Sequence, residues 1–142
     1  MSDLDHLFER IVAGEIPSHK VYENELVYAF LDINPLSRGH TLVIPKTRYE
    51  RIDQLPPETA AALGRALPTV AAAVMKATGT TAYNVLCNTG RPAGQLIPHV
   101  HFHIIPKHAD GSGLPHNWPA APIDKDDAPA LCQAIVDAMP TA

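Results

Sequence analysis

Residues 99–106, HVHFHIIP, place three of the eight histidines of this chain at every second position and end in a proline. Side chains of a β-strand alternate between its two faces, so His99, His101 and His103 are expected to share one face. The apolar residues between them would then point into the core. We therefore predict a strand over 99–105 that presents three imidazoles on one side.

Around this strand, the hydrophobic pattern predicts an α+β domain. The predicted elements are, in chain order, a helix over 3–13, strands over 21–23, 26–32 and 40–45, a helix over 57–78, strands over 83–87 and 99–105, and a helix over 127–139. Pro68 lies inside the long helix and is expected to kink it or to split it in two. This order of elements is typical of a mainly antiparallel sheet with one long helix and short terminal helices.

The composition excludes some classes of function. The formal net charge is −4 and the isoelectric point is about 6.0, with no cluster of Lys and Arg, so a general nucleic-acid-binding protein is not expected. No segment approaches the roughly 20 apolar residues of a membrane helix, and the charged N-terminus differs from a signal peptide. Two scattered cysteines, Cys87 and Cys132, suit a reducing compartment. We expect a cytoplasmic protein without a membrane partner.

Three imidazoles on one strand face can serve more than one purpose. They can bind a metal ion, since a catalytic zinc needs about three protein ligands and one open position. They can act on a phosphate, because a neutral imidazole is a nucleophile that forms a covalent phosphoryl adduct. They can also form a polar, half-exposed strand face without chemistry. Spacing alone leaves all three interpretations open.

Four stretches of this chain carry a family resemblance. They are IVAGEIPSHKVYE (11–23), FLDINP (30–35), GHTLVIPK (39–46) and AGQLIPHVHFHIIP (93–106). Together they resemble the histidine triad family, and in particular its nucleotide-binding hydrolase branch. The resemblance covers about residues 5–108 of a single domain, residues 1–142, and the Pro/Gly-rich tail with its helix, 109–142, matches less well. It implies a five-stranded antiparallel sheet and a homodimer.

The resemblance also implies a reaction. Members of this family bind purine nucleotides and cleave the bond between the α-phosphate and its leaving group. His101, the middle histidine, would attack phosphorus and form a nucleotidyl-histidine intermediate, without a metal or another cofactor. A nucleoside phosphoramidase acting on an AMP-like ligand is the favoured activity. A dinucleoside polyphosphate hydrolase, a metal-binding protein and a nucleotide-binding module of low activity stay as alternatives.

The family pattern assigns further site residues by position. His99 and His103 would orient His101 and contact the phosphate, and His40 would lie near the leaving group. The remaining assignments are Asp32 for the ribose hydroxyls, Phe8, Ile11 and Ile16 for the base, and Asn88, Gly94 and Gln95 for the phosphate side. Other interpretations stay open: His40 as a half-buried strand residue, Asp32 as a turn former, and the three apolar residues as plain core.

The chain also departs from the family pattern. Leu96 stands where relatives commonly carry Ser or Thr after Gly-Gln, so a side-chain donor to the phosphate is missing. Some bacterial relatives bind a structural zinc, but the matching positions here are His6, Glu9, Arg48 and His99. Arginine is not a zinc ligand, and we expect no metal at this place. In the tail, Trp118 is expected to pack as an anchor for the Pro-rich segment.

Overall fold

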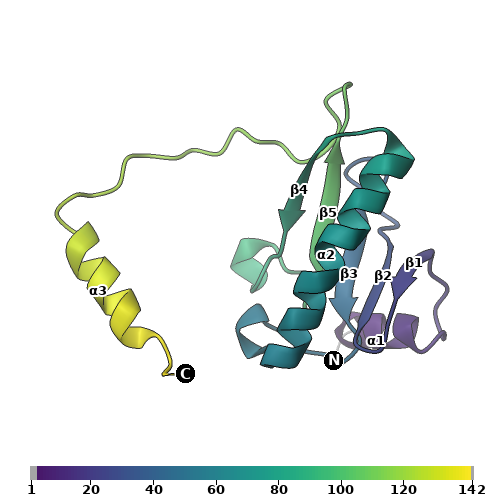
Figure 1. The fold of residues 1–142 in the computed structure, drawn as a ribbon, viewed down its shortest axis with the longest axis horizontal. Coiled ribbons are helices and arrows are strands. Elements are labelled where there is room, and N and C mark those ends of the chain that lie inside the picture. Colours follow the sequence, from purple (N-terminus) through teal and green to yellow (C-terminus); the bar gives the residue numbers. More distant parts are fainter. Residues whose placement is uncertain (1–2, 142) are drawn as a thin grey trace.

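The computed structural model describes residues 3–141 and contains a five-stranded antiparallel sheet with helices (Figure 1). The strands are β1 (Lys20–Glu23), β2 (Val27–Leu31), β3 (Thr41–Pro45), β4 (Ala82–Leu86) and β5 (Phe102–Lys107). The helices are α1 (Leu7–Val12), α2 (Pro57–Thr78) and α3 (Ala128–Ala138), with 3₁₀ turns at Asp3–His6, Ile52–Gln54 and Arg91–Ala93. The strand order is β1-β2-β3-β5-β4, and every neighbouring pair is antiparallel. The predicted α+β class and sheet are confirmed.

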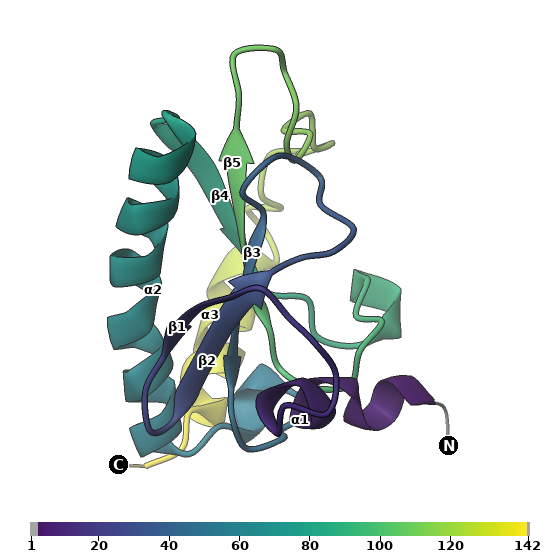
Figure 2. The ribbon, with the colours of Figure 1, turned by 90° about the vertical axis from the view of Figure 1, so that its right-hand side faces the viewer.

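Different helices cover the two faces of the sheet (Figure 2). On one face, α2 packs against the central strands in a cluster that includes Val43 and Ile104. On the other face, α1 packs through Phe8, whose ring also contacts the rings of His99 and His101. Since both faces are covered, all five residues of β3 are buried, and this explains their nearly continuous apolar sequence. The histidines therefore lie on the α1 side of the sheet.

Strand β5 begins at Phe102, so the predicted start at His99 is wrong. The β3–β5 ladder runs from Thr41, opposite Ile104, to Val43, opposite Phe102. Continuing it would require the backbone N–H that a proline lacks, because β3 ends at Pro45. The preceding segment leaves the ladder, and the N–H of Val100 donates to the Tyr49 carbonyl instead.

Helix α2 is continuous over 22 residues, so the predicted split at Pro68 is wrong. Pro68 cannot donate to the carbonyl of Gly64, but both residues lie on the exposed side of the helix, where water can reach that carbonyl. The helix ends as predicted at Gly79, which has φ +72° and donates its N–H to Met75. One long helix thus covers the central strands on this face.

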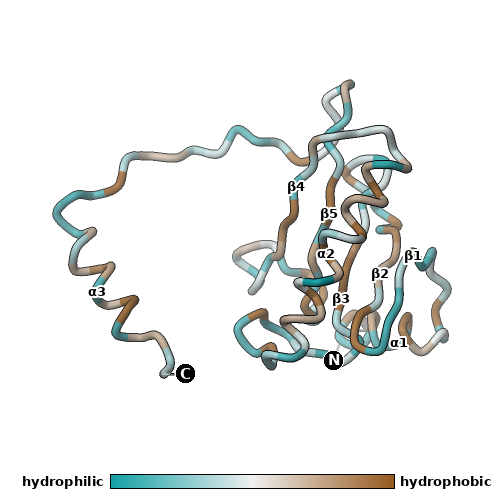
Figure 3. The backbone as a smooth tube through the Cα atoms, viewed as in Figure 1, coloured by the Kyte–Doolittle hydropathy of each residue, from teal (hydrophilic) through white to brown (hydrophobic). Residues whose placement is uncertain are grey.

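Beyond β5 the chain leaves the body of the domain (Figure 1). An extended tail carries α3 away, and none of the α3 residues is buried. Trp118 has 65% of its surface exposed and donates to the Pro115 carbonyl within the same tail, so the prediction of a packing anchor is wrong within this chain. Apolar residues are nevertheless frequent along α3 (Figure 3). Within residues 3–141, no helix combines the length and the apolar character needed to cross a lipid bilayer.

Candidate active site

Four histidines meet where β3 and β5 pair. His40 directly precedes β3, and His103 lies in β5 opposite Leu42, so the β3–β5 register brings two distant segments together. The ring centroids of His101 and His103 are 4.9 Å apart, and those of His40 and His103 are 5.1 Å apart. The alternation along 99–103 therefore assembles the cluster even though the regular strand starts later.

The hydrogen bond of His101 fixes which of its nitrogens carries the proton. Its Nδ1 lies 2.7 Å from the carbonyl oxygen of His99. A carbonyl can only accept, so Nδ1–H is the donor, and in the neutral ring Nε2 keeps a free lone pair. The side chain is 7% exposed and its ring meets Phe8 edge-on at 5.1 Å. His101 is thus a held imidazole with one nucleophilic nitrogen.

A second set of hydrogen bonds fixes His103 through His40. The N–H of Leu36 donates to His40 Nδ1 over 3.0 Å, so the proton of neutral His40 sits on Nε2. That Nε2 lies 2.9 Å from His103 Nδ1, which must then accept. His103 consequently carries its proton on Nε2. The pair therefore presents an N–H donor beside the lone pair of His101.

Asp32 lies next to this pair and also builds a turn. One oxygen, Oδ1, accepts the N–H of Asn34 over 2.8 Å, as an Asx turn requires. The other, Oδ2, lies 3.5 Å from His40 Nε2. The turn therefore uses only one oxygen of the carboxylate, and the second oxygen faces the histidines.

His99 is the most buried member of the triad, with 1% of its surface exposed. Its Nε2–H donates to the Pro45 carbonyl over 2.8 Å, and its Nδ1 has no hydrogen-bond partner among the described residues. Phe8 packs edge-on against it at 5.4 Å. His99 thus shapes the site through its backbone carbonyl, which holds His101.

The assigned base residues belong to the core. Phe8 and Ile11 are buried in the cluster between α1 and the sheet, and Ile16 packs against that cluster in a half-buried position. Ile33, which directly follows Asp32, is 79% exposed and was not singled out from the sequence. An apolar side chain left exposed beside a polar cluster was the missed signal, and exposure cannot be read from a sequence.

The loop after β4 is held by Gln95. This side chain is buried, accepts the N–H of Gly90 over 2.7 Å, and donates to the carbonyls of Glu50 and Ile97. The polar atoms of the Gln95 side chain are thus used in hydrogen bonds that hold the loop in place. Gly94 has φ +99°, and a Cβ there would lie 3.2 Å from the Nδ2 atom of Asn88.

Burial keeps the site histidines neutral. Burial is the largest cause that lowers the pKa of His40, His99 and His101 below the usual value. It also lowers the pKa of His103, to about 4, with neighbouring His101 and His40 as further causes. At neutral pH the four imidazoles are therefore uncharged, as the proton positions derived above require.

The potential metal ligands that lie close together are not the three triad histidines. Within residues 3–141, three potential ligands lie close together in one place, with the nearest atoms of Asp32, His40 and His103 within 4.8 Å of one another. There His40 uses both nitrogens for hydrogen bonds. His6 instead pairs with Glu9, at 2.7 Å. Within the described residues, neither the set His99, His101 and His103 nor the set His6, Glu9 and His99 forms such a group of close ligand atoms.

Comparison with known proteins gives consistent matches. Residues 13–110 match the family model of the HIT domain. "Protein hit" of Bacillus subtilis is 45% identical over 112 residues, which are 79% of this chain and 77% of that protein. "Adenosine 5'-monophosphoramidase hnt1" of Schizosaccharomyces pombe is 46% identical over 129 residues, 91% of this chain and 94% of that protein. The crystal structure of a HIT family member from Bacillus subtilis superposes with a TM-score of 0.90 at 38% identity and covers 96% of this chain and 98% of that one.

Proposed function

The chain belongs to the HIT domain family, and on this premise we propose that it is a nucleotide hydrolase that cleaves nucleoside 5′-phosphoramidates through His101. The observation that carries the proposal is the hydrogen bond from His101 Nδ1 to the His99 carbonyl, which leaves Nε2 free. The name of the fission yeast relative supports the phosphoramidate as substrate. A second relative, "Adenylylsulfatase HINT3" of Arabidopsis thaliana, supports attack at the same phosphorus with a different leaving group.

In the proposed reaction, Nε2 of His101 forms a bond to the α-phosphorus. The bond from phosphorus to nitrogen breaks, and the nitrogen keeps that electron pair, takes up a proton from water and leaves as a neutral amine. Water then attacks the nucleotidyl-histidine and loses a proton to the solvent, which releases the nucleoside monophosphate and restores neutral His101. Splitting one displacement into two easier steps is the advantage of a covalent intermediate.

The other polar groups have separate tasks in this proposal. The Nε2–H of His103 donates to a phosphate oxygen, and His40 holds His103 in the correct tautomer. The Oδ2 of Asp32, which lies 3.5 Å from His40 Nε2, accepts from a ribose hydroxyl, while its Oδ1 maintains the turn. The base is expected against the edge of the apolar cluster, at half-buried Ile16 and exposed Ile33.

The direct test is hydrolysis of adenosine 5′-phosphoramidate, with and without a chelator. Turnover that survives chelation supports the proposal. Turnover that chelation abolishes would instead favour a metal-dependent reaction. Diadenosine polyphosphate is assayed in parallel, since a higher kcat/KM on it would favour the dinucleoside polyphosphate hydrolase. Tight binding of adenosine monophosphate with negligible turnover would identify a binding module.

The reaction is expected to require neutral histidines. Protonation of His101 removes its lone pair, and its pKa is lowered, so kcat/KM should stay level above about pH 6.5 and decline only below it. The fall is measured from pH 4 to 9 with substrate-alone blanks, because the P–N bond hydrolyses spontaneously in acid. A decline that begins well above pH 6.5 would contradict a nucleophile whose pKa burial lowers.

Leu96 is expected to limit the rate. Its side chain is 79% exposed and offers no donor to a phosphate oxygen. Loss of one such donor typically costs about 10²-fold or more in kcat, so Leu96→Ser should raise kcat by about tenfold or more. Leu96→Ala is the matched control, since it removes the bulk without adding a hydroxyl. If both variants reach the same rate, the missing hydroxyl is not the cause.

Homodimerisation and a cytoplasmic location complete the proposal. Strand β4 is an edge of the sheet, and its Tyr83 and Val85 are 43% and 48% exposed on one face. A second copy that adds its own β4 would satisfy this edge and cover both side chains. Cys87 and Cys132 are free thiols, which fits a reducing compartment. Sedimentation velocity measures the oligomeric state.

A further inference from the structure

Helix α3 has an apolar face that nothing in its own chain covers. Leu131 and Ile135 are four residues apart and lie on one side of α3, Met139 follows at its C-cap, and the three side chains are 49%, 50% and 63% exposed. Gln133 and Asp137 lie on the opposite side and are joined by a hydrogen bond of 2.7 Å. An isolated helix of 11 residues is marginal in water. A covering surface is therefore required to hold α3 in place.

The solved Bacillus subtilis structure indicates that the detached position is a property of the fold. The body of the domain, residues 1–108, makes up only about three quarters of the 142 residues, so superposition of the body alone could not give a TM-score of 0.90. A TM-score of 0.90 over 96% of this chain is reached only if the tail and α3 superpose as well as the body. The solved structure thus shares the projecting position of α3, which a covering surface on another molecule would explain.

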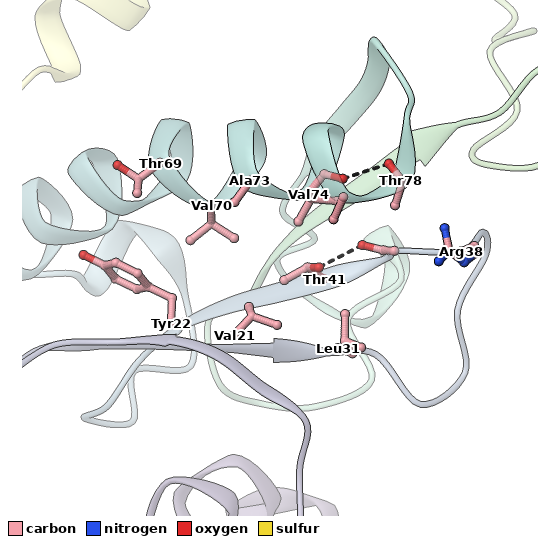
Figure 4. A pocket seen from close by; sticks show the side chains of 12 residues that line it. Val21, Tyr22, Leu31, Arg38, Thr41, Thr69, Val70, Ala73, Val74 and Thr78 are labelled. Atoms are coloured by element: carbon pink, nitrogen blue, oxygen red, sulfur yellow. Dashed lines mark hydrogen bonds between the residues drawn. The ribbon is translucent and has the colours of Figure 1, made fainter.

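A mainly apolar groove lies on the α2 face of the sheet (Figure 4). It has a volume of about 450 Å³ and lies between α2 and the edge formed by β1 and β2. Its walls are mainly apolar, with Val70 and Val74 from α2 above Val21 and Leu31 from the strands. The site histidines lie on the other face, so the groove is separate from the proposed active site.

The topology places this groove of a second copy beside α3. Strands β1 and β4 are opposite edges of the sheet. In the proposed dimer a two-fold axis pairs the two β4 edges, so the β1 edge of the partner lies farthest out, beyond β4 of the first copy. The tail carries α3 to that same side (Figure 1), and α3 lies at the level of α2 and the sheet rather than of α1 (Figure 2). We infer that α3 of each copy docks in the groove between α2 and β1 of its partner.

Charge and chain stiffness fit this exchange. The groove is lined by one charged residue, Arg38, whereas α3 follows the acidic stretch 124–127, which contains three aspartates and one lysine. Three prolines, Pro115, Pro119 and Pro122, favour an extended tail. Such a spacer holds α3 away from its own groove, which lies at the opposite edge of the sheet, and reaches the groove of a second copy.

The test measures hydrogen exchange of the α3 amides in the full-length protein. Leu131→Asp combined with Ile135→Asp damages the helix face, and Ala73→Trp blocks the groove at an exposed position of α2. Gln133→Ala, on the polar side, and Ala73→Ser, which leaves the groove open, are the matched controls. We expect the α3 amides to exchange about tenfold or more faster in both damaging variants and unchanged in both controls.

A mixed dimer separates exchange between copies from docking within one chain. The helix-damaged and groove-blocked chains are coexpressed with different tags, and the mixed dimer is purified. Docking between copies predicts that α3 of the groove-blocked chain regains protection, because its partner still has an open groove. No recovery, protection that persists in dilute monomer, or a protein monomeric at all concentrations would each overturn the inference. None of these readouts depends on turnover, so the proposed activity is tested separately.

Discussion

Replacing His101 with alanine is expected to lower kcat on adenosine 5′-phosphoramidate by about 10⁴-fold or more, the scale of loss when a covalent nucleophile is removed. The hydrogen bonds leave two lone pairs free in the triad. One is on the buried Nδ1 of His99, and the other is on Nε2 of His101. His103 cannot replace it, because its Nδ1 is occupied by His40 and its Nε2 carries the proton. Single-turnover kinetics measures the loss.

The comparison for this variant is His19→Ala, an exposed histidine outside the cluster. It should keep wild-type kcat, and His101→Ala should keep its far-UV circular dichroism and its affinity for adenosine monophosphate within a few-fold. Retained phosphoramidate turnover in correctly folded His101→Ala would transfer the nucleophilic role to another group. Loss of the fold in this variant is resolved with His101→Asn, which keeps a polar side chain of similar size.

Ile104→Ala is expected to lower the free energy of unfolding by about 3 kcal/mol, within the range for buried Ile→Ala changes. Ile104 is 0% exposed, lies in the cluster under α2 and directly follows His103 in β5. The alanine removes apolar contacts and leaves a cavity that close-packed neighbours fill only in part. Urea unfolding followed by circular dichroism gives the difference.

Ile123→Ala is the matched change at an exposed position, 71% accessible in the tail, and should shift the free energy by less than about 0.5 kcal/mol. An equal loss in both variants would mean that the α2 face is not the main core. A loss in Ile104→Ala well below about 2 kcal/mol would carry the same meaning.

The sheet was predictable because its strands are bounded by strong local signals. Alternation placed His101 and His103 on one face, and Pro45 marked the end of β3, whereas β5 continues through Pro106 to Lys107, past the predicted end at residue 105. The start of β5 was not predictable, since it depends on which distant residue accepts the N–H of Val100. Pro68 was misjudged because the cost of a proline depends on whether water reaches the carbonyl four residues earlier.

The closeness of the candidate histidines was predictable, but the hydrogen bonds between them were not. The resemblance pointed to His40 and the triad, and the structure brings them together. The proton on His103 is set by the backbone N–H of Leu36, a contact that no side-chain motif encodes. Similarly, Gln95 follows the family pattern, yet its polar atoms all serve the loop. Trp118 was misjudged because the covering surface for a tail can lie in another molecule.

The contact between His40 and His103 joins residues 63 positions apart and exists only where β3 meets β5. The intervening chain contains all of α2 and β4, so this contact closes a long loop, which carries a high entropic cost and raises the contact order. A partly folded chain with α2 formed but β3 and β5 unpaired would lack the His103 donor. During refolding, recovered activity therefore reports closure of the central sheet and cannot precede it.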